Sequence, residues 1–126
     1  MSLSEIAQRI VDRRPPDVMA ADCPSRQVLQ HVTSRWGTLV LLALLAGTHR
    51  FSALRRRIGG VSERMLAQTL DLLEGDGLVL RVAHNVVPPH VDYSLTPLGQ
   101  QAAEQVAALT GWIEQALPQI LAQRAG

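Results

Sequence analysis

The residues best suited to reading another molecule are Arg64 and Gln68, which lie four positions apart and so share one side of a helix. At about 100° per residue, the segment 63–74 turns its apolar side the other way. That side is formed by Leu66, Leu70 and Leu73. Arginine and glutamine can each form two hydrogen bonds to a base edge, on guanine and adenine respectively. We expect the pair to contact DNA rather than to be plain surface residues. Ala67 and Asp71 flank the pair, and the negative charge of Asp71 opposes contact with DNA.

Positive charge is concentrated just before this segment and at its start. The 126-residue chain has 12 basic residues, all arginine, and 11 acidic ones, for a formal net charge of +1. Residues 50–64 hold five arginines and one glutamate, which gives +4. The arginines are Arg50, Arg55, Arg56, Arg57 and Arg64. Such a patch predicts an anionic partner bound through one face, unless it is only a solvated helix surface.

The short helix expected at 53–58 decides which of these arginines point outward. With Leu54 and Ile58 facing inward, Arg56 points directly outward and its two neighbours lie on the flanks. We expect Arg56 and one neighbour to contact phosphates, which position a protein without reading sequence. The candidate phosphate contacts are Arg50, Arg55 and Arg56.

The single cysteine, Cys23, precedes Pro24 at the start of a predicted helix, where the helix dipole favours the thiolate form. One cysteine excludes a disulfide within the chain and fits a reducing compartment. Any disulfide would join two subunits or a small thiol. Cys23 is therefore a candidate redox-sensing residue, and the alternative is a small buried hydrophobic residue.

Other chemistry is poorly supported. His90 and Asp92 lie two apart on one strand face, but the remaining histidines show no ligand spacing, so a surface pair is expected rather than a metal site. Cys23 and His31 would lie about 12 Å apart in one helix, too far for a nucleophile and its base. Glycine-rich phosphate loops and nucleophile motifs are absent from the sequence. We expect no catalytic residue, no metal and no cofactor.

The elements that position these residues follow a recognisable order. Helices are expected at 3–13, 24–32, 36–46, 53–58, 63–74 and 98–117, a very short strand at 48–51, and a hairpin at 78–84 and 90–95. Ser52, Ser62 and Thr96 are expected to cap the helices that follow them, and Pro118 to kink or end the last one. Two short capped helices around Gly59-Gly60, followed by a hairpin, indicate a winged helix-turn-helix. The fold class is mainly α with a small β-hairpin (α+β).

The sequence contains no segment typical of a transmembrane helix or a signal peptide. The longest apolar run, 39–46, is far shorter than the roughly 20 residues needed to span a bilayer, and the N-terminus is too charged for a signal peptide. We expect a soluble, cytoplasmic protein with no membrane partner.

Several runs, in matching order over about residues 23–110, resemble the HxlR-type winged helix-turn-helix regulators, and within them the YtfH-like branch. They are CP at 23–24, RW at 35–36, HRFSALRR at 49–56, VSERML at 61–66, DGLV at 76–79 and VPPHVDYSLT at 87–96. The resemblance implies a bacterial, dimeric DNA-binding transcription factor whose terminal helices form the dimer. It also implies that residues 85–90 form the wing, and that some members sense oxidants or electrophiles through a cysteine at the position of Cys23. The recognition-helix residues that it implies are Ser62, Arg64, Ala67 and Gln68.

The chain departs from this family where DNA affinity is concerned. Relatives often have basic residues where Thr69 and Asp71 stand, and an arginine where His90 stands. The tip of the hairpin therefore offers only Asn85 and His90 to DNA, which is a weak wing.

The sequence thus predicts a homodimer that binds double-stranded DNA at a pseudo-palindromic operator, with its two recognition helices roughly 34 Å apart. The expected parts are an N-terminal dimerisation helix and linker at 1–22, a DNA-binding domain at 23–96 and a C-terminal dimerisation helix at 97–126. The expected dimer contacts are Leu3, Ile6, Ile10, Leu98, Ala102, Val106, Leu109, Ile113 and Leu117. The alternative is a winged helix that contacts only proteins; the operator and any small-molecule effector stay unknown.

Overall fold

The computed structural model describes residue 2 and residues 15–126. The chain divides into two compact units, residues 1–30 and 31–126. The helix expected at 3–13 lies outside the described residues. The first described helix, α2 (Pro24–Thr33), begins at the proline, as predicted. The three-part division at 22 and 96 stays a prediction.

The larger unit is built around α3 (Arg35–Leu45), whose apolar residues fill the core. Ser34 caps this helix, because its hydroxyl oxygen accepts the N–H of Gly37 at 3.0 Å. Val40, Leu41 and Leu44 are at most 2% exposed. The burial predicted from the apolar composition of this helix holds for one side only, because Leu39 is 37% exposed and Leu42 and Leu45 are half-buried.

The next two helices, α4 (Phe51–Arg57) and α5 (Glu63–Gly75), form the helix-turn-helix. The Ser62 cap is confirmed, because its hydroxyl oxygen accepts the N–H of Met65 at 3.1 Å. The Ser52 cap is wrong: α4 begins at Phe51, and Arg50 takes the cap position without a side-chain hydrogen bond. The reason is that Arg50 ends a strand, so the chain enters the helix directly from the sheet.

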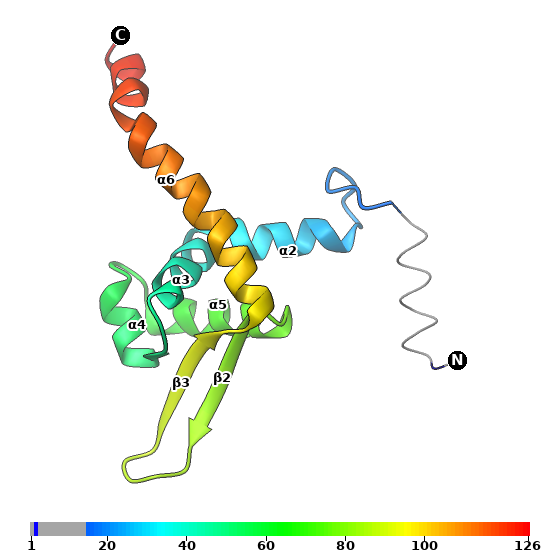
Figure 1. Ribbon diagram of the computed structural model, residues 1–126, viewed down its shortest axis with the longest axis vertical. Coiled ribbons are helices and arrows are strands. Elements are labelled where there is room, and N and C mark those ends of the chain that lie inside the picture. Colours follow the sequence, from blue (N-terminus) through cyan, green and yellow to red (C-terminus); the bar gives the residue numbers. More distant parts are fainter. Residues whose placement is uncertain (1, 3–14) are drawn as a thin grey trace. The chain divides into compact units, whose positions relative to one another are not determined.

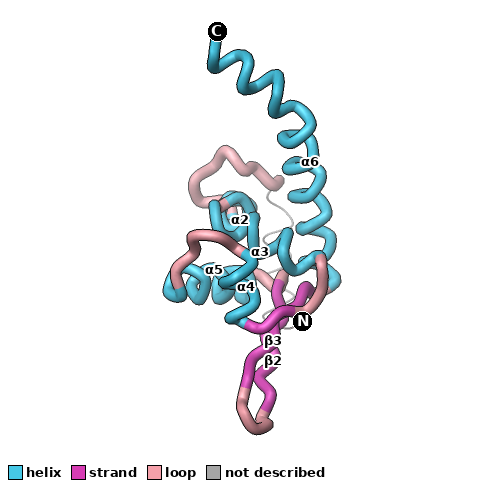
Figure 2. Tube along the Cα trace, turned by 90° about the vertical axis from the view of Figure 1, so that its left-hand side faces the viewer, coloured by secondary structure: helices cyan, strands magenta, loops and turns pink. Residues whose placement is uncertain are grey.

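Three antiparallel strands, β1 (His49–Arg50), β2 (Val79–His84) and β3 (His90–Leu95), form a sheet in the order β1-β3-β2. Figures 1 and 2 show β2 and β3 projecting as a hairpin beyond the helices of this unit. Tyr93 faces the core from β3 and is 9% exposed. The arrangement is a winged helix-turn-helix, as the sequence predicts.

The last helix, α6 (Pro97–Ala125), begins against the sheet and ends far from it (Figure 1). Thr96 caps it by accepting the N–H of Gly99 at 2.9 Å, which confirms that prediction. The predicted end near 117 is wrong, because the helix continues through Pro118 to Ala125. A proline removes one hydrogen bond but does not prevent a helix from resuming, and Figure 2 shows α6 changing direction over its C-terminal half.

Within the described residues, no single helix is long and apolar enough to cross a membrane. Only α2 and α3 taken together meet that test, as the core helices of globular proteins also can.

Candidate nucleic-acid interface

Helix α5 turns one face to solvent and the other to the core. The exposed residues include Arg64, Ala67, Gln68 and Asp71. The buried residues are Leu66, Leu70 and Leu73, each at most 1% exposed. Thr69 is also buried, and its hydroxyl donates to the carbonyl oxygen of Met65 at 2.7 Å. The two faces predicted from the helical period are confirmed.

The start of α5 carries the charges that an anion would meet. The first backbone N–H groups of a helix give its N-terminus a partial positive charge. Arg64 adds a full charge at the second helical residue, and Glu63 subtracts one at the first. In the described part of the chain, no ion-pair partner lies within 4.0 Å of Arg64. Its guanidinium is therefore available for an external acceptor.

The arginines at the end of α4 have different surroundings. Nη1 of Arg55 lies 3.2 Å from Oε1 of Glu63, so this exposed pair joins the two helices across their turn. Arg56 is also exposed and is not ion-paired within the described residues. A phosphate that binds Arg55 would have to replace the carboxylate of Glu63, whereas a phosphate that binds Arg56 would replace no ion-pair partner.

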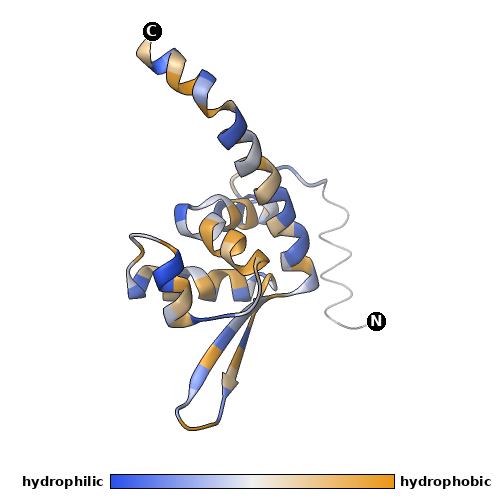
Figure 3. Ribbon diagram, turned by 60° about the vertical axis from the view of Figure 1, so that its left-hand side comes forward, coloured by the Kyte–Doolittle hydropathy of each residue, from blue (hydrophilic) through white to orange (hydrophobic). Residues whose placement is uncertain are grey.

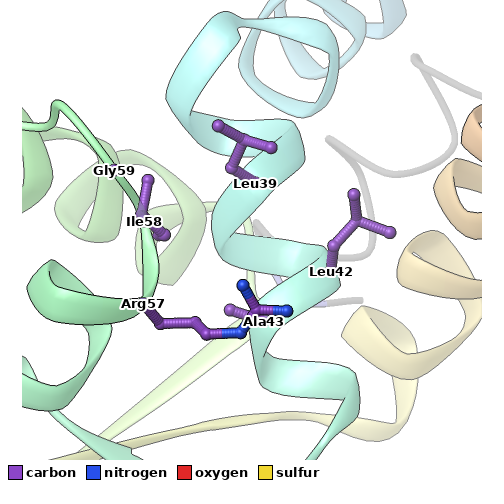
Figure 4. Close-up of a pocket in the computed structure, with 6 residues that line it drawn as sticks. All are labelled: Leu39, Leu42, Ala43, Arg57, Ile58 and Gly59. Atoms are coloured by element: carbon purple, nitrogen blue, oxygen red, sulfur yellow. The ribbon is translucent and has the colours of Figure 1, made fainter.

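Arg57 points in another direction. Figure 4 shows its side chain extending toward Ala43 on α3, along one side of an open pocket of about 200 Å³. The pocket is otherwise lined by Leu39, Leu42, Ile58 and Gly59. Arg57 thus lies against an apolar surface through its methylene groups. The expected phosphate contact by Arg56 and one neighbour stays a prediction.

The wing offers DNA little charge at its tip. Asn85 is exposed, as expected. His90 is directed into a cluster instead: its ring stacks on that of His84 with centroids 4.6 Å apart, and both histidines face Asp92. Sequence reasoning missed His84. A symmetrical turn at 85–89 would have predicted it, because such a turn places residues 84 and 90 opposite each other.

Cys23 lies immediately before α2 and is 5% exposed. The backbone N–H of Asp17 donates to its Sγ at 3.4 Å, and Oγ of Ser25 lies 3.0 Å from the same sulfur. All three residues belong to the first unit. A backbone N–H directed at sulfur favours negative charge there. Burial of the thiol opposes such a charge, so a redox-sensing role for Cys23 stays a prediction.

The residues predicted to form a dimer divide into three groups. Leu98, Leu109, Ile113 and Leu117 are exposed, and so can contact a partner. Val106 is 6% exposed in the chain's own core, and Ala102 is half-buried against that core, so a contact of either residue with a partner stays a prediction. Leu3, Ile6 and Ile10 lie outside the described residues.

Two exposed apolar residues farther along α6 were not among the predicted dimer contacts. Trp112 is 59% exposed and Leu121 is 49% exposed. Figure 3 shows apolar and polar bands alternating along this half of the helix. Leu121 was left out because the helix was expected to end near residue 117. The helical period of 3.6 residues also does not show which part of a long helix packs against the core of the same chain.

Comparison with known proteins adds four findings. The sequence model of the HxlR-like helix-turn-helix family matches residues 31–121. The chain is 60% identical over 124 residues to the HTH-type transcriptional regulator YtfH of Escherichia coli K12, covering 98% of this chain and 96% of that protein. The solved structure of the transcriptional regulator ytfH from Salmonella typhimurium matches with a TM-score of 0.84 at 64% identity, over 88% of this chain and 99% of that one. The redox regulator HypR in its oxidized form matches with a TM-score of 0.68 at 33% identity, over 74% and 96%.

Proposed function

Because this chain belongs to the HxlR-like helix-turn-helix family, it is a transcriptional regulator of the helix-turn-helix type, and we propose that it binds double-stranded DNA sequence-specifically as a homodimer. The site of action is the cytoplasm of a bacterium. The protein acts by binding and not by catalysis.

The exposed face of α5 is the observation that carries this proposal. Arg64 and Gln68 stand on it beside the helix N-terminus, while the opposite face is fixed in the core. With α5 in the major groove, Arg64 would bind a guanine edge and Gln68 an adenine edge. Arg56 would hold a phosphate from α4, and Asn85 would approach the backbone from the wing.

The apolar surface of α6 supports the homodimer. From residue 109 onward, α6 exposes large apolar side chains that a solitary domain would leave in water. They are Leu109, Trp112, Ile113, Leu117 and Leu121. A two-fold axis along this surface would present the two α5 helices to successive major grooves, about 34 Å apart, on a pseudo-palindromic operator.

Oxidation of Cys23 would supply a signal. One solved relative, HypR, is described as a redox regulator in its oxidized form. A peroxide would convert the Cys23 thiolate to a sulfenic acid and be reduced to water. Condensation of that acid with a second thiol would release water and form a disulfide. Because the chain has one cysteine, the second thiol belongs to another subunit or to a small molecule.

A protein-contact role without DNA binding is the second candidate. Two observations favour it: Asp71 is exposed on the same face as Gln68, and His90 is held by Asp92 within the wing. Counterion release separates the two functions, because only binding to phosphates weakens steeply as salt concentration rises.

The test is binding to the DNA immediately upstream of the protein's own gene, measured by fluorescence anisotropy across a salt series, with and without oxidant. We expect a steep salt dependence and a preference for this DNA over scrambled DNA. Arg64→Ala should reduce that preference by roughly 1–3 kcal/mol. Arg124→Ala, which removes an equal charge near the end of α6, is the matched control and should leave it unchanged. Absence of binding at low salt would favour the protein-contact role.

A further inference from the structure

The wing brings together three side chains that suit a metal ion. His84 on β2 pairs directly with His90 on β3, and Asp92 follows two residues later on the same face. One ligand atom from each lies within 4.8 Å of the other two. Tyr93 points to the opposite face, into the core, so the cluster occupies the outer face of the hairpin.

The distances are close to those that a bound ion would impose. Oδ2 of Asp92 lies 2.8 Å from Nε2 of His84 and 3.8 Å from Nε2 of His90. Ligand atoms around a tetrahedral zinc ion, with bonds of about 2.0–2.2 Å, stand about 3.3 Å apart. The ligand atoms of the two imidazoles lie within 4.8 Å of each other. Rotation of the three side chains would therefore bring their ligand atoms to a common centre, with the backbone pairing unchanged.

The chemistry of the three ligands selects the class of ion. Two imidazoles and one carboxylate suit zinc and its neighbours cobalt, nickel and copper, whereas magnesium and calcium prefer oxygen ligands alone. Three protein ligands leave one position of a tetrahedron for water. The side chains are 22–39% exposed, so an ion has access from solvent and is still partly shielded from it.

One neighbouring charge weakens cation binding at this cluster, and one contact within the cluster favours it. Arg50 on β1 pairs with Asp92 from the other side of β3, and its positive charge weakens the attraction for a cation. The stacked rings of His84 and His90 hold both imidazoles in place before an ion arrives. That preorganisation lowers the entropy that binding must overcome.

We propose that the hairpin of this protein binds one divalent transition-metal ion, of the zinc class, through His84, His90 and Asp92. The ion ties β2 to β3 near the hairpin tip and replaces the net negative charge of Asp92 with a positive one. Metal binding by the chain is independent of its DNA target. Loss of DNA binding would therefore leave this proposal standing.

The experiment uses the full-length, tag-free chain in metal-free buffer. Cobalt chloride is titrated while the visible absorption bands of tetrahedral cobalt are recorded, and zinc chloride is titrated in a calorimeter. We expect saturation at one ion per chain. Removing a ligand in His84→Gln or Asp92→Asn should weaken binding by more than the roughly 10–100-fold typical of losing an outer-shell partner.

Two control variants identify the site. His49→Gln removes an imidazole outside the cluster, which contacts the carbonyl of Gly47. Cys23→Ser removes the single thiol, a type of group that binds zinc but lies outside the proposed site. Both should bind metal like the wild type. Circular dichroism checks the fold of each variant, and His90→Gln replaces His84→Gln if the latter is unfolded. The proposal is overturned if wild type binds no ion at micromolar concentration, if both cluster variants bind normally, or if either control loses the ion.

Discussion

Replacing Gly99 by alanine tests how α6 is seated on the sheet. A Cβ added at Gly99 would lie 1.8 Å from the carbonyl oxygen of Leu78 and 2.8 Å from its carbonyl carbon. Both atoms are backbone, so the start of α6 or the start of β2 must move. Gly111, on the same helix, meets no atom within 4 Å when a Cβ is added. The two glycines therefore differ in packing and share the same helix propensity.

The magnitude follows from that comparison. Alanine in place of glycine stabilises a helix interior by about 1 kcal/mol, which applies in full to Gly111 and is an upper bound for Gly99 in the first turn of α6. The difference between Gly99→Ala and Gly111→Ala therefore isolates the clash, which costs roughly 1–3 kcal/mol or more in a packed site. For a chain of this size, that difference separates the two melting temperatures by roughly 3–15 °C.

The assay is thermal unfolding of both variants and the wild type, followed by circular dichroism. All samples are measured at one protein concentration, because the stability of a dimer depends on it. Sedimentation velocity checks that the variants assemble alike. If Gly99→Ala were as stable as Gly111→Ala, α6 could not approach the Leu78 carbonyl as described.

Four further predictions concern binding. Arg56→Ala should weaken binding to all DNA alike and lower the slope of log K against log salt by about 1, as measured by anisotropy. Asp71→Asn should strengthen DNA binding, most clearly at low salt, because a negative charge leaves the binding face. Cys23→Ser should retain DNA binding and lose any response to oxidant, as measured in the same titration. Ile113→Asp should raise the dissociation constant of the dimer more than about tenfold in sedimentation experiments, because it puts an uncompensated charge into an apolar contact.

Each of these predictions has a result that would contradict it. A purely sequence-selective loss in Arg56→Ala would mean that Arg56 reads bases and does not hold a phosphate. Weaker DNA binding by Asp71→Asn would place that side chain in a favourable contact. A persistent oxidant response without Cys23 would leave the residue structural. A dimer unaffected by Ile113→Asp would place the interface elsewhere, and Gln119→Asp on the same helix is the control.

Features set by neighbours along the chain were predictable from the sequence. The caps at Ser62 and Thr96 each satisfy an N–H three residues on. The orientation of Arg64 and Gln68 followed from the leucines between and beyond them. Local hydrogen bonds and the helical period suffice in these cases, because every atom involved lies within two helical turns.

Features set by distant contacts were not predictable in this way. Ser52 has a good capping side chain, but pairing of β1 with β3 moved the start of α4 ahead of it. Val106 fits an amphipathic pattern, yet only the packing of α6 shows that the chain's own core covers it. His84 lies in the cluster because the strand register pairs it with His90. Each error came from a contact between different helices or strands, which the pattern within one segment does not show.

The short strand β1 has a consequence for the entropy of recognition. His49 pairs with Tyr93 across 44 positions, and that pairing closes a loop containing the whole helix-turn-helix. Closing a loop of this length costs about 3 kcal/mol, and folding meets the cost before any ligand arrives. β2 pairs with the other edge of β3. The two strands that flank the helix-turn-helix in the sequence are therefore fastened to the same strand. α5 and the hairpin therefore meet a ligand as one preorganised body, with little chain freedom left to lose.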